Sequence, residues 1–96
     1  MKKLTKTTLY VGHNVNNFPT WTHNDIIHYV VYGWGINDAT FMEAQGVWKG
    51  GSEETTVITF IGNKCKRWYY IALKEALEQK FKQEEVLLEI SKVETL

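Results

Sequence analysis

The chain has 96 residues, which is the size of one domain with room for a single core. Its 44% hydrophobic and 23% charged residues are typical of a globular protein and exclude a disordered one. Eleven basic and eleven acidic residues cancel, which argues against duplex nucleic acid as a partner because that partner requires a basic face. We therefore expect residues 1–96 to form one domain.

The sequence predicts a cytoplasmic protein. Threonines interrupt any apolar region after the initial Met-Lys-Lys, and no apolar run approaches the roughly 18 residues of a membrane span. The lone cysteine, Cys65, cannot form an internal disulfide, which fits a reducing compartment. We expect no membrane partner.

Residues 7–13 are predicted to form the first strand. Leu9 and Val11 alternate with polar or small residues, so both side chains should point toward the core. The next stretch, residues 14–20, contains three asparagines and one proline, which predicts a loop.

Residues 22–32 are predicted to form a short helix. Thr22 and Asp25 have the spacing of a capping box at its start, and Gly33 follows its end. Its apolar positions are all β-branched, so its stability must come from docking on a sheet rather than from intrinsic propensity.

Two strands at 39–49 and 53–61 flank Gly50 and Gly51, and this pattern predicts a β-hairpin. A long helix over 64–81 follows, with Trp68 among the residues that recur at helical spacing and should face the core. Residues 84–92 then form the last strand.

This order of elements predicts the fold class. A β-α-β-β-α-β chain is typical of the ferredoxin-like α+β fold, a four-stranded antiparallel sheet with two helices on one face. The other face stays open, and domains of this shape cover it with a second copy or use it to hold a ligand. We therefore expect a homodimer or a higher homo-oligomer.

Three segments resemble a group of small uncharacterised proteins of phages and prophages. They are Leu9-Tyr10-Val11-Gly12-His13-Asn14, Glu43-Ala44-Gln45-Gly46-Val47-Trp48-Lys49 and Glu53-Glu54-Thr55-Thr56, with Gln83-Glu84-Glu85-Val86 as a fourth, longer by one residue than its counterpart. The resemblance runs from about residue 8 to residue 90 and implies the same fold. Four residues match no motif of the group: Trp21, His23, His28 and Trp34.

The resemblance also implies a setting. Small phage proteins without enzymatic signatures often inhibit host systems, and some sequester nucleotide-derived signals of antiviral defence. A phage-encoded chain would act in the cytoplasm of the host cell.

The aromatic residues are numerous for one modest core. Four tryptophans and five tyrosines combine apolar area with a polar tip, and some should lie in an interface or stack on a planar ligand. Lys64 and Arg67 at the start of the second helix could bind an anion. The candidate ligand-binding residues are Tyr10, His13, Asn14, Trp21, His23, Trp34, Trp48, Lys64 and Arg67.

Catalytic motifs are missing from the sequence. It has no nucleophile elbow, phosphate loop or dinucleotide fingerprint, so no catalytic residue and no cofactor is assigned. His23 and His28 are five residues apart and point in different directions on a helix, so no metal site is expected either.

Three functions remain open. The first hypothesis is a non-enzymatic protein that sequesters a nucleotide-like or ADP-ribose-like signal, and an enzymatic role is left uncertain and less favoured. The second is a small lyase, isomerase or cofactor-free oxygenase that uses His13 with Glu43 or Glu54 on the open face of the sheet. The third is an inhibitor that binds a host protein through Trp21, Tyr29, Tyr32 and Trp34.

Overall fold

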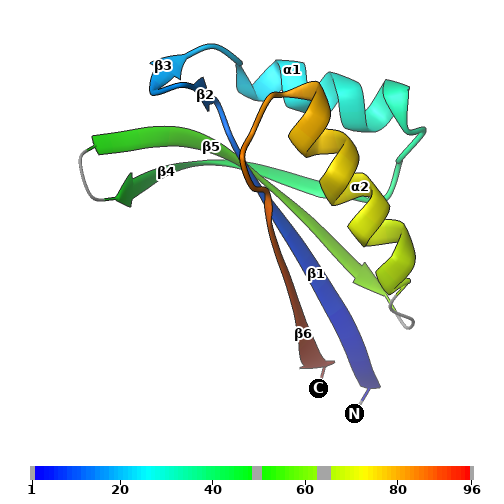
Figure 1. The fold of residues 1–96 in the computed structure, drawn as a ribbon. Coiled ribbons are helices and arrows are strands. Elements are labelled where there is room, and N and C mark those ends of the chain that lie inside the picture. The colour runs from blue at the N-terminus through cyan, green and yellow to red at the C-terminus, as the bar shows by residue number, and fades with distance from the viewer. Residues whose placement is uncertain (1, 49–50, 63–65, 96) are drawn as a thin grey trace.

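The computed structural model describes residues 2–48, 51–62 and 66–95, and it has the predicted α+β architecture (Figure 1). The elements are β1 (Lys2–Gly12), β2 (Asn14–Val15), β3 (Phe18–Pro19), α1 (His23–His28), η1 (Tyr29–Gly33), β4 (Thr40–Trp48), β5 (Gly51–Gly62), α2 (Arg67–Lys80) and β6 (Leu87–Thr95). Four strands form an antiparallel sheet in the order β4-β5-β1-β6. This is the strand order of the ferredoxin-like fold, with β1 and β5 central.

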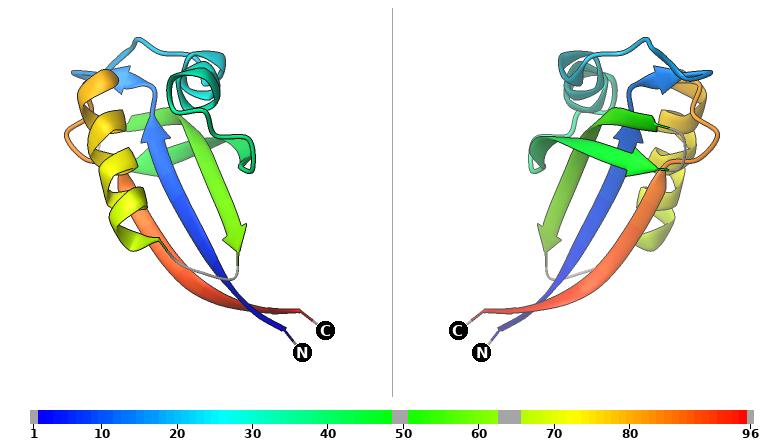
Figure 2. Two further views of the ribbon diagram at one scale, coloured as in Figure 1. Left: turned by 90° about the vertical axis from the view of Figure 1, so that its right-hand side faces the viewer. Right: turned by 90° about the vertical axis from the view of Figure 1, so that its left-hand side faces the viewer.

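Both helices cover the same face of the sheet, and the opposite face has no helix over it (Figure 2). The core lies between the helices and the sheet. Leu9 and Val11 of β1 are fully buried there, as their alternation predicts. Ile58 of β5 and Leu73 and Leu77 of α2 are fully buried in the same cluster.

The first strand is longer than predicted, because β1 begins at Lys2 rather than at residue 7. Leu4 is the only apolar residue among residues 2–6, so this stretch shows no alternation that a sequence pattern could reveal. Its pairing partner is remote in sequence: Leu4 lies opposite Val93 of β6. Together β1 and β6 extend beyond the helical layer toward the two termini (Figure 1).

The first helix has the predicted start. The Thr22 hydroxyl accepts from the Asp25 N–H at 3.1 Å, and the Asp25 carboxylate accepts from the Thr22 N–H at 2.8 Å. The segment then changes to the π-helix η1 before it ends at Gly33. Such wide turns are rare, and propensity does not predict them.

The predicted loop 14–20 contains a small hairpin. Asn14 pairs with Pro19 and Val15 pairs with Phe18. The two residues between them, Asn16 and Asn17, have φ angles of 51° and 68°, which is the φ pattern of a type I′ turn. Asparagine tolerates this left-handed conformation better than most residues, so the Asn-Asn pair could have predicted the turn from the sequence.

The prediction that Trp68 faces the core is wrong, because its side chain is 73% exposed. It lies five residues from Leu73, which places the two side chains about 140° apart around the helix. The predicted start of this helix at Lys64, together with Cys65, lies outside the described residues. Within the described part of the chain, no helix has the length and apolarity needed to span a bilayer.

Candidate functional site

The backbone of His13 joins three parts of the fold where β1 ends. Its N–H donates to the carbonyl of Glu54 on β5 at 3.0 Å. Its carbonyl accepts from the N–H groups of Thr20 and Trp21 at 3.0 and 2.9 Å, where the chain returns from the small hairpin. Consequently the end of β1, the start of β5 and the segment before α1 hold a fixed arrangement.

This junction borders a small pocket, which we call the strand-end pocket. Its volume is about 240 Å³, below the roughly 300 Å³ of the smallest common ligand sites, so it can hold only part of a drug-sized ligand. Its lining residues are His13, Asn14, Pro19, Trp21, Gln45, Ser52, Glu53 and Glu54.

Glu53 is held in place at the edge of this pocket. Its carboxylate accepts from the backbone N–H of Asn14 at 2.8 Å. The carboxyl group lies directly over Gly12, where an added Cβ would come within 2.5 Å of it. The absence of a side chain at Gly12 therefore allows Glu53 to fold back over β1.

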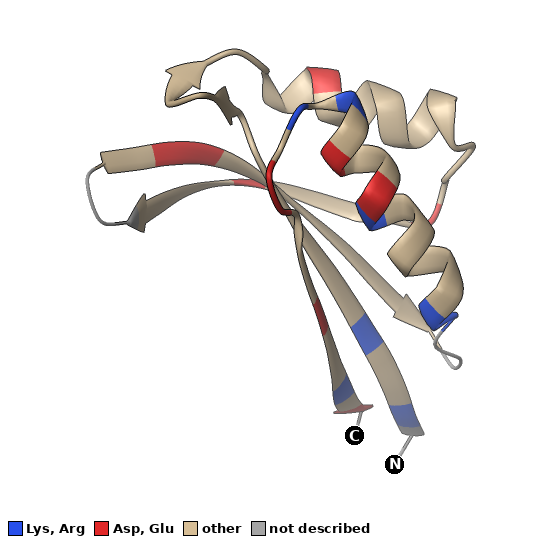
Figure 3. Cartoon of the chain, in the orientation of Figure 1, with Lys and Arg blue, Asp and Glu red and all other residues tan. Residues whose placement is uncertain are grey.

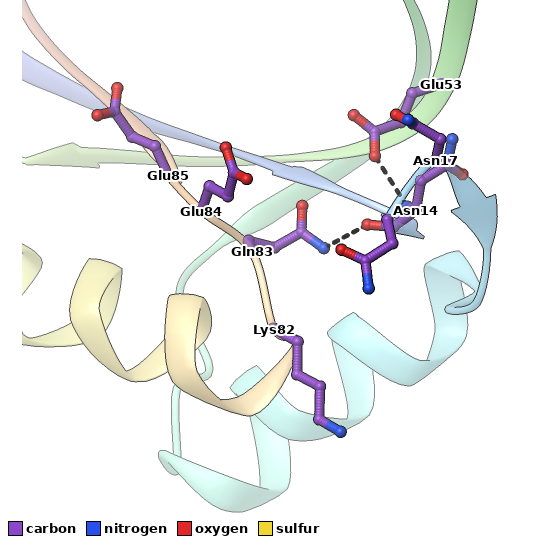
Figure 4. Close-up of a pocket in the computed structure, with 8 residues that line it drawn as sticks. Asn14, Asn17, Glu53, Lys82, Gln83, Glu84 and Glu85 are labelled. Carbon is purple, nitrogen blue, oxygen red and sulfur yellow. Dashed lines mark hydrogen bonds between the residues drawn. The ribbon is translucent and has the colours of Figure 1, made fainter.

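A second hollow, the polar basin, adjoins the strand-end pocket and shares Asn14 and Glu53 with it (Figure 4). The Gln83 amide donates to the carbonyls of Asn14 and Phe81, at 2.9 and 3.0 Å. Those bonds fasten the chain after α2 to the small hairpin. The basin is lined by Asn14, Asn16, Asn17, Glu53, Lys82, Gln83, Glu84 and Glu85.

A third hollow, the sheet-face groove, lies on the face of the sheet that the helices leave uncovered. Its volume is about 510 Å³, within the usual range for a ligand of nucleoside size. Gln45 lines both this groove and the strand-end pocket, so the two are neighbours. The groove is lined by Lys6, Thr8, Tyr10, Met42, Ala44, Gln45, Gly46, Thr55, Val57, Thr59 and Leu87.

Two histidines meet on the other side of the sheet. His13 Nε2 and His23 Nδ1 each lie 2.8 Å from the hydroxyl oxygen of Thr56, which is fully buried. One hydroxyl has a single proton to donate, so at most one imidazole accepts from it and the other must donate to it. Glu43 lies opposite Thr56 in the β4–β5 pairing, on the same side of the sheet.

Burial lowers the pKa of His13, and the nearby His23 lowers it further. The carboxylates of Glu43, Glu54 and Glu53 act in the opposite direction, in that order of strength. Burial is the largest of these effects, so His13 favours the neutral form more than an exposed histidine does.

Acidic residues lie near the start of β5 and between α2 and β6, whereas several basic residues lie toward the chain termini and the start of α2 (Figure 3). Glu53, Glu54, Glu84 and Glu85 line the strand-end pocket and the polar basin, and we call these four residues the acidic corner. Lys82 is the one basic residue in the two linings, so the corner keeps a net negative charge that favours a cationic ligand.

The structure brings together some of the predicted ligand-binding residues. His13, Asn14 and Trp21 line the strand-end pocket, and His23 reaches His13 through Thr56. Tyr10 lies in the sheet-face groove, and its phenol donates to Glu89 at 2.9 Å.

Other predicted residues lie elsewhere. The Trp34 indole donates to the Tyr29 hydroxyl at 3.2 Å and packs edge-on against Tyr69 of α2, away from the pocket. Arg67 begins α2 after the Gly62 end of β5, opposite the end that carries Glu53. Lys64 and the side chain of Trp48 lie outside the described residues.

The predicted pairing of His13 with Glu43 or Glu54 on the open face needs correction. Thr56 and Ile58 are buried on the helix-covered side, Glu43 lies opposite Thr56, and Glu54 alternates in phase with Thr56. Both carboxylates therefore belong to the covered side, as does His13. Gln45 and Thr56 were not among the predicted ligand-binding residues. Alternation along β4 and β5 indicated their faces, but only the strand register placed them near His13.

No protein-family model and no curated protein matches this sequence. Two solved structures do match it. A phage SAM lyase in complex with S-methyl-5'-thioadenosine has a TM-score of 0.74 and 29% identity, over 92% of this chain and 80% of that chain. A phage SAM lyase in the apo state has a TM-score of 0.71 and 28% identity, over 92% and 79%.

These neighbours confirm the predicted resemblance to small phage proteins and support a phage origin. They are lyases of SAM (S-adenosylmethionine), and one of the two holds S-methyl-5'-thioadenosine. The likeness therefore favours the enzyme alternative over the non-enzymatic binding protein that sequence reasoning placed first.

The lowered pKa of His13 predicts a pH-dependent stability. Because the unfolded chain binds a proton at this histidine more readily, the free energy of unfolding should decrease as the pH falls below about 6.5. Urea unfolding between pH 8 and pH 5, with a chelator present, measures this. His13→Asn should flatten the dependence, whereas His28→Asn, at an exposed position, should not. Equal slopes for all three proteins would contradict the assignment.

The contact between Gly12 and Glu53 gives a second prediction. Gly12→Ala should displace the carboxylate, break its bond to Asn14 and lower the free energy of unfolding by about 1 to 2 kcal/mol. In a Glu53→Ala background the same substitution should cost little, because the clash is gone. If Gly12→Ala lowers the free energy of unfolding equally in both backgrounds, Gly12 is required for another reason.

Proposed function

We propose that this chain is a lyase that cleaves SAM into S-methyl-5'-thioadenosine and homoserine lactone. The observation that carries the proposal is the likeness, at 29% identity over 92% of the chain, to a phage SAM lyase with that thioadenosine bound. This proposal keeps the nucleotide-like ligand of the first hypothesis. It differs in that the protein cleaves the ligand instead of only sequestering it.

The reaction needs no side-chain nucleophile. A carboxylate oxygen of SAM attacks the γ-carbon of its own methionine portion and forms the new C–O bond of a five-membered lactone. The bond between that carbon and the sulfonium breaks, and its electron pair stays on sulfur as a neutral thioether. No water or cofactor is consumed, which suits a chain without a nucleophile motif. Elimination would instead require a base to remove an unactivated C–H proton.

The sheet-face groove has the properties that accelerate such a step. The attacking carboxylate and the sulfonium have opposite charges that disappear together in the transition state. An apolar, water-poor surface solvates the separated charges less well than water does, and so it lowers the barrier. Met42, Val57 and Leu87 supply apolar walls, and the Tyr10 ring offers a face for the adenine.

The acidic corner attracts the substrate electrostatically. SAM has two positive groups, the sulfonium and the α-ammonium, against one carboxylate. Glu53 lies opposite Gly46, which lines the groove, so its carboxylate can hold the ammonium, which keeps its charge throughout the reaction. The thioadenosine product is neutral, so it loses this attraction and leaves more readily.

A second copy of the chain completes this groove. On one protomer the groove is bounded by the sheet on one side only, and Met42 and Leu87 are 58% and 54% exposed there. Pairing of open faces would bury these side chains and exclude water from the sulfonium. A homo-oligomer is therefore part of the proposed active form.

Purified protein incubated with SAM should release S-methyl-5'-thioadenosine and homoserine lactone in equal amounts, measured by liquid chromatography with mass spectrometry. Glu53→Gln should raise KM about two- to fivefold with little change in kcat, because it removes uniform binding of the ammonium. Affinity for the neutral thioadenosine should be unchanged.

Glu75→Gln is the matched control, since Glu75 is an exposed carboxylate on α2 that lines none of the three hollows. Its kinetics should equal those of the parent chain. Absence of thioadenosine release would overturn the proposed reaction, and equal KM values for the two variants would remove Glu53 from the site.

Sedimentation analysis tests whether a second copy of the chain completes the groove. The parent chain should sediment as an oligomer, and Met42→Glu should shift it toward the monomer and lower SAM turnover at the same time. Trp68→Glu places the same charge on an exposed apolar position of α2 and should leave both unchanged. A parent chain that is monomeric and fully active would contradict this step.

A further inference from the structure

Three metal-ligating side chains converge on the helix-covered side of the sheet, outside the sheet-face groove. One imidazole nitrogen from each of His13 and His23 and one carboxylate oxygen from Glu43 all lie within 4.8 Å of one another. They come from three elements: His13 follows β1, His23 begins α1 and Glu43 lies on β4. We call this set the histidine cluster.

The chemistry of the cluster matches a particular class of ion. Two imidazoles and one carboxylate form a ligand set used for Zn²⁺, with a fourth position left for water or another oxygen. His13 is buried, and a buried imidazole without a partner charge is neutral, which is the form that binds a metal. A carboxylate in the set also offsets part of the ion's charge.

The hydrogen bonds already aim both rings at one point. His13 Nε2 and His23 Nδ1 each lie 2.8 Å from the Thr56 hydroxyl oxygen, so their nitrogens converge from opposite elements. Zinc–nitrogen bonds of about 2.0–2.1 Å at tetrahedral angles place two ligand nitrogens about 3.4 Å apart. The present separations are at most 4.8 Å, so closure requires each pair of ligand atoms to approach by no more than about 1.4 Å.

The required movements are available. The backbone of His13 is fixed on both sides by hydrogen bonds, so its ring can serve as the stationary ligand. His23 is half-buried at the first position of a short helix, and Glu43 is exposed on the edge strand of the sheet. Both can approach His13 by side-chain rotation without disturbing the core.

We propose that His13, His23 and Glu43 form a Zn²⁺ site that fastens α1 to the end of β1 and to β4. The ion would take the place of the bridge that the Thr56 hydroxyl now makes between the two rings. Its fourth position would be filled by water or by Thr56. Zn²⁺ binding can be measured without SAM, because none of the three ligands lines the sheet-face groove, although His13 also borders the strand-end pocket.

Zinc binding to the full chain tests the proposal. After dialysis against a chelator and its removal, titration calorimetry should find one Zn²⁺ per chain with a Kd of about 1 µM or lower. Saturating Zn²⁺ should raise the melting temperature by at least about 5 °C. Co²⁺ should give the intense visible absorption of a tetrahedral ion.

His23→Ala and Glu43→Gln should each weaken Zn²⁺ at least about tenfold, the smallest loss that removal of even an outer-shell partner gives. Both positions are partly or fully exposed, so these variants should retain more stability than variants of buried His13. His28→Ala is the control, because His28 is exposed on the same helix and packs on Tyr32. Absence of stoichiometric binding, or an equal loss in His28→Ala, would overturn the site.

Discussion

The arrangement of the whole site depends on the hydrogen bonds of one peptide segment, the end of β1 at His13. Its N–H is bound to β5, and its carbonyl is bound to the chain that returns before α1. These bonds place Glu53 and Glu54 beside Asn14, and they hold the His13 ring against Thr56. Without them the acidic corner and the histidine cluster would lose the fixed backbone that positions one relative to the other.

The two faces of the sheet have different proposed roles. The covered face holds the core and ends in a polar network of histidines and threonine. The open face has an apolar groove, and the acidic corner lies at one end of this groove. That separation suits a substrate with a permanent positive charge and a planar base, since attraction comes from the corner and desolvation from the groove.

The fold could be predicted from local patterns, and the site only in part. Leu9 and Val11 alternate with polar residues, and Gly50-Gly51 marks a turn, so strands and hairpin followed directly. The prediction for Trp68 was wrong because helical periodicity does not show at which residue the buried face of a helix begins. His13 and His23 meet only through the chain reversal at Asn16-Asn17, so the spacing of His23 and His28 carried no information about that pair.

The proposed function could not be predicted because no residue in the sequence has the signature of SAM chemistry. A reaction that uses the substrate's own carboxylate needs shape and low polarity rather than a nucleophile, and such properties leave no motif. Aromatic excess favoured a nucleotide-like ligand, which is consistent with the thioadenosine that one neighbour binds, but it did not distinguish binding from turnover.

A crystal structure of the chain with S-methyl-5'-thioadenosine tests the central claim most directly. The account predicts the nucleoside in the sheet-face groove, with its base against Tyr10 and its sulfur near Met42 and Val57, and a second copy closing over it. Density for the nucleoside in the aromatic hollow beside Tyr29 and Tyr32, with the groove empty, would contradict it.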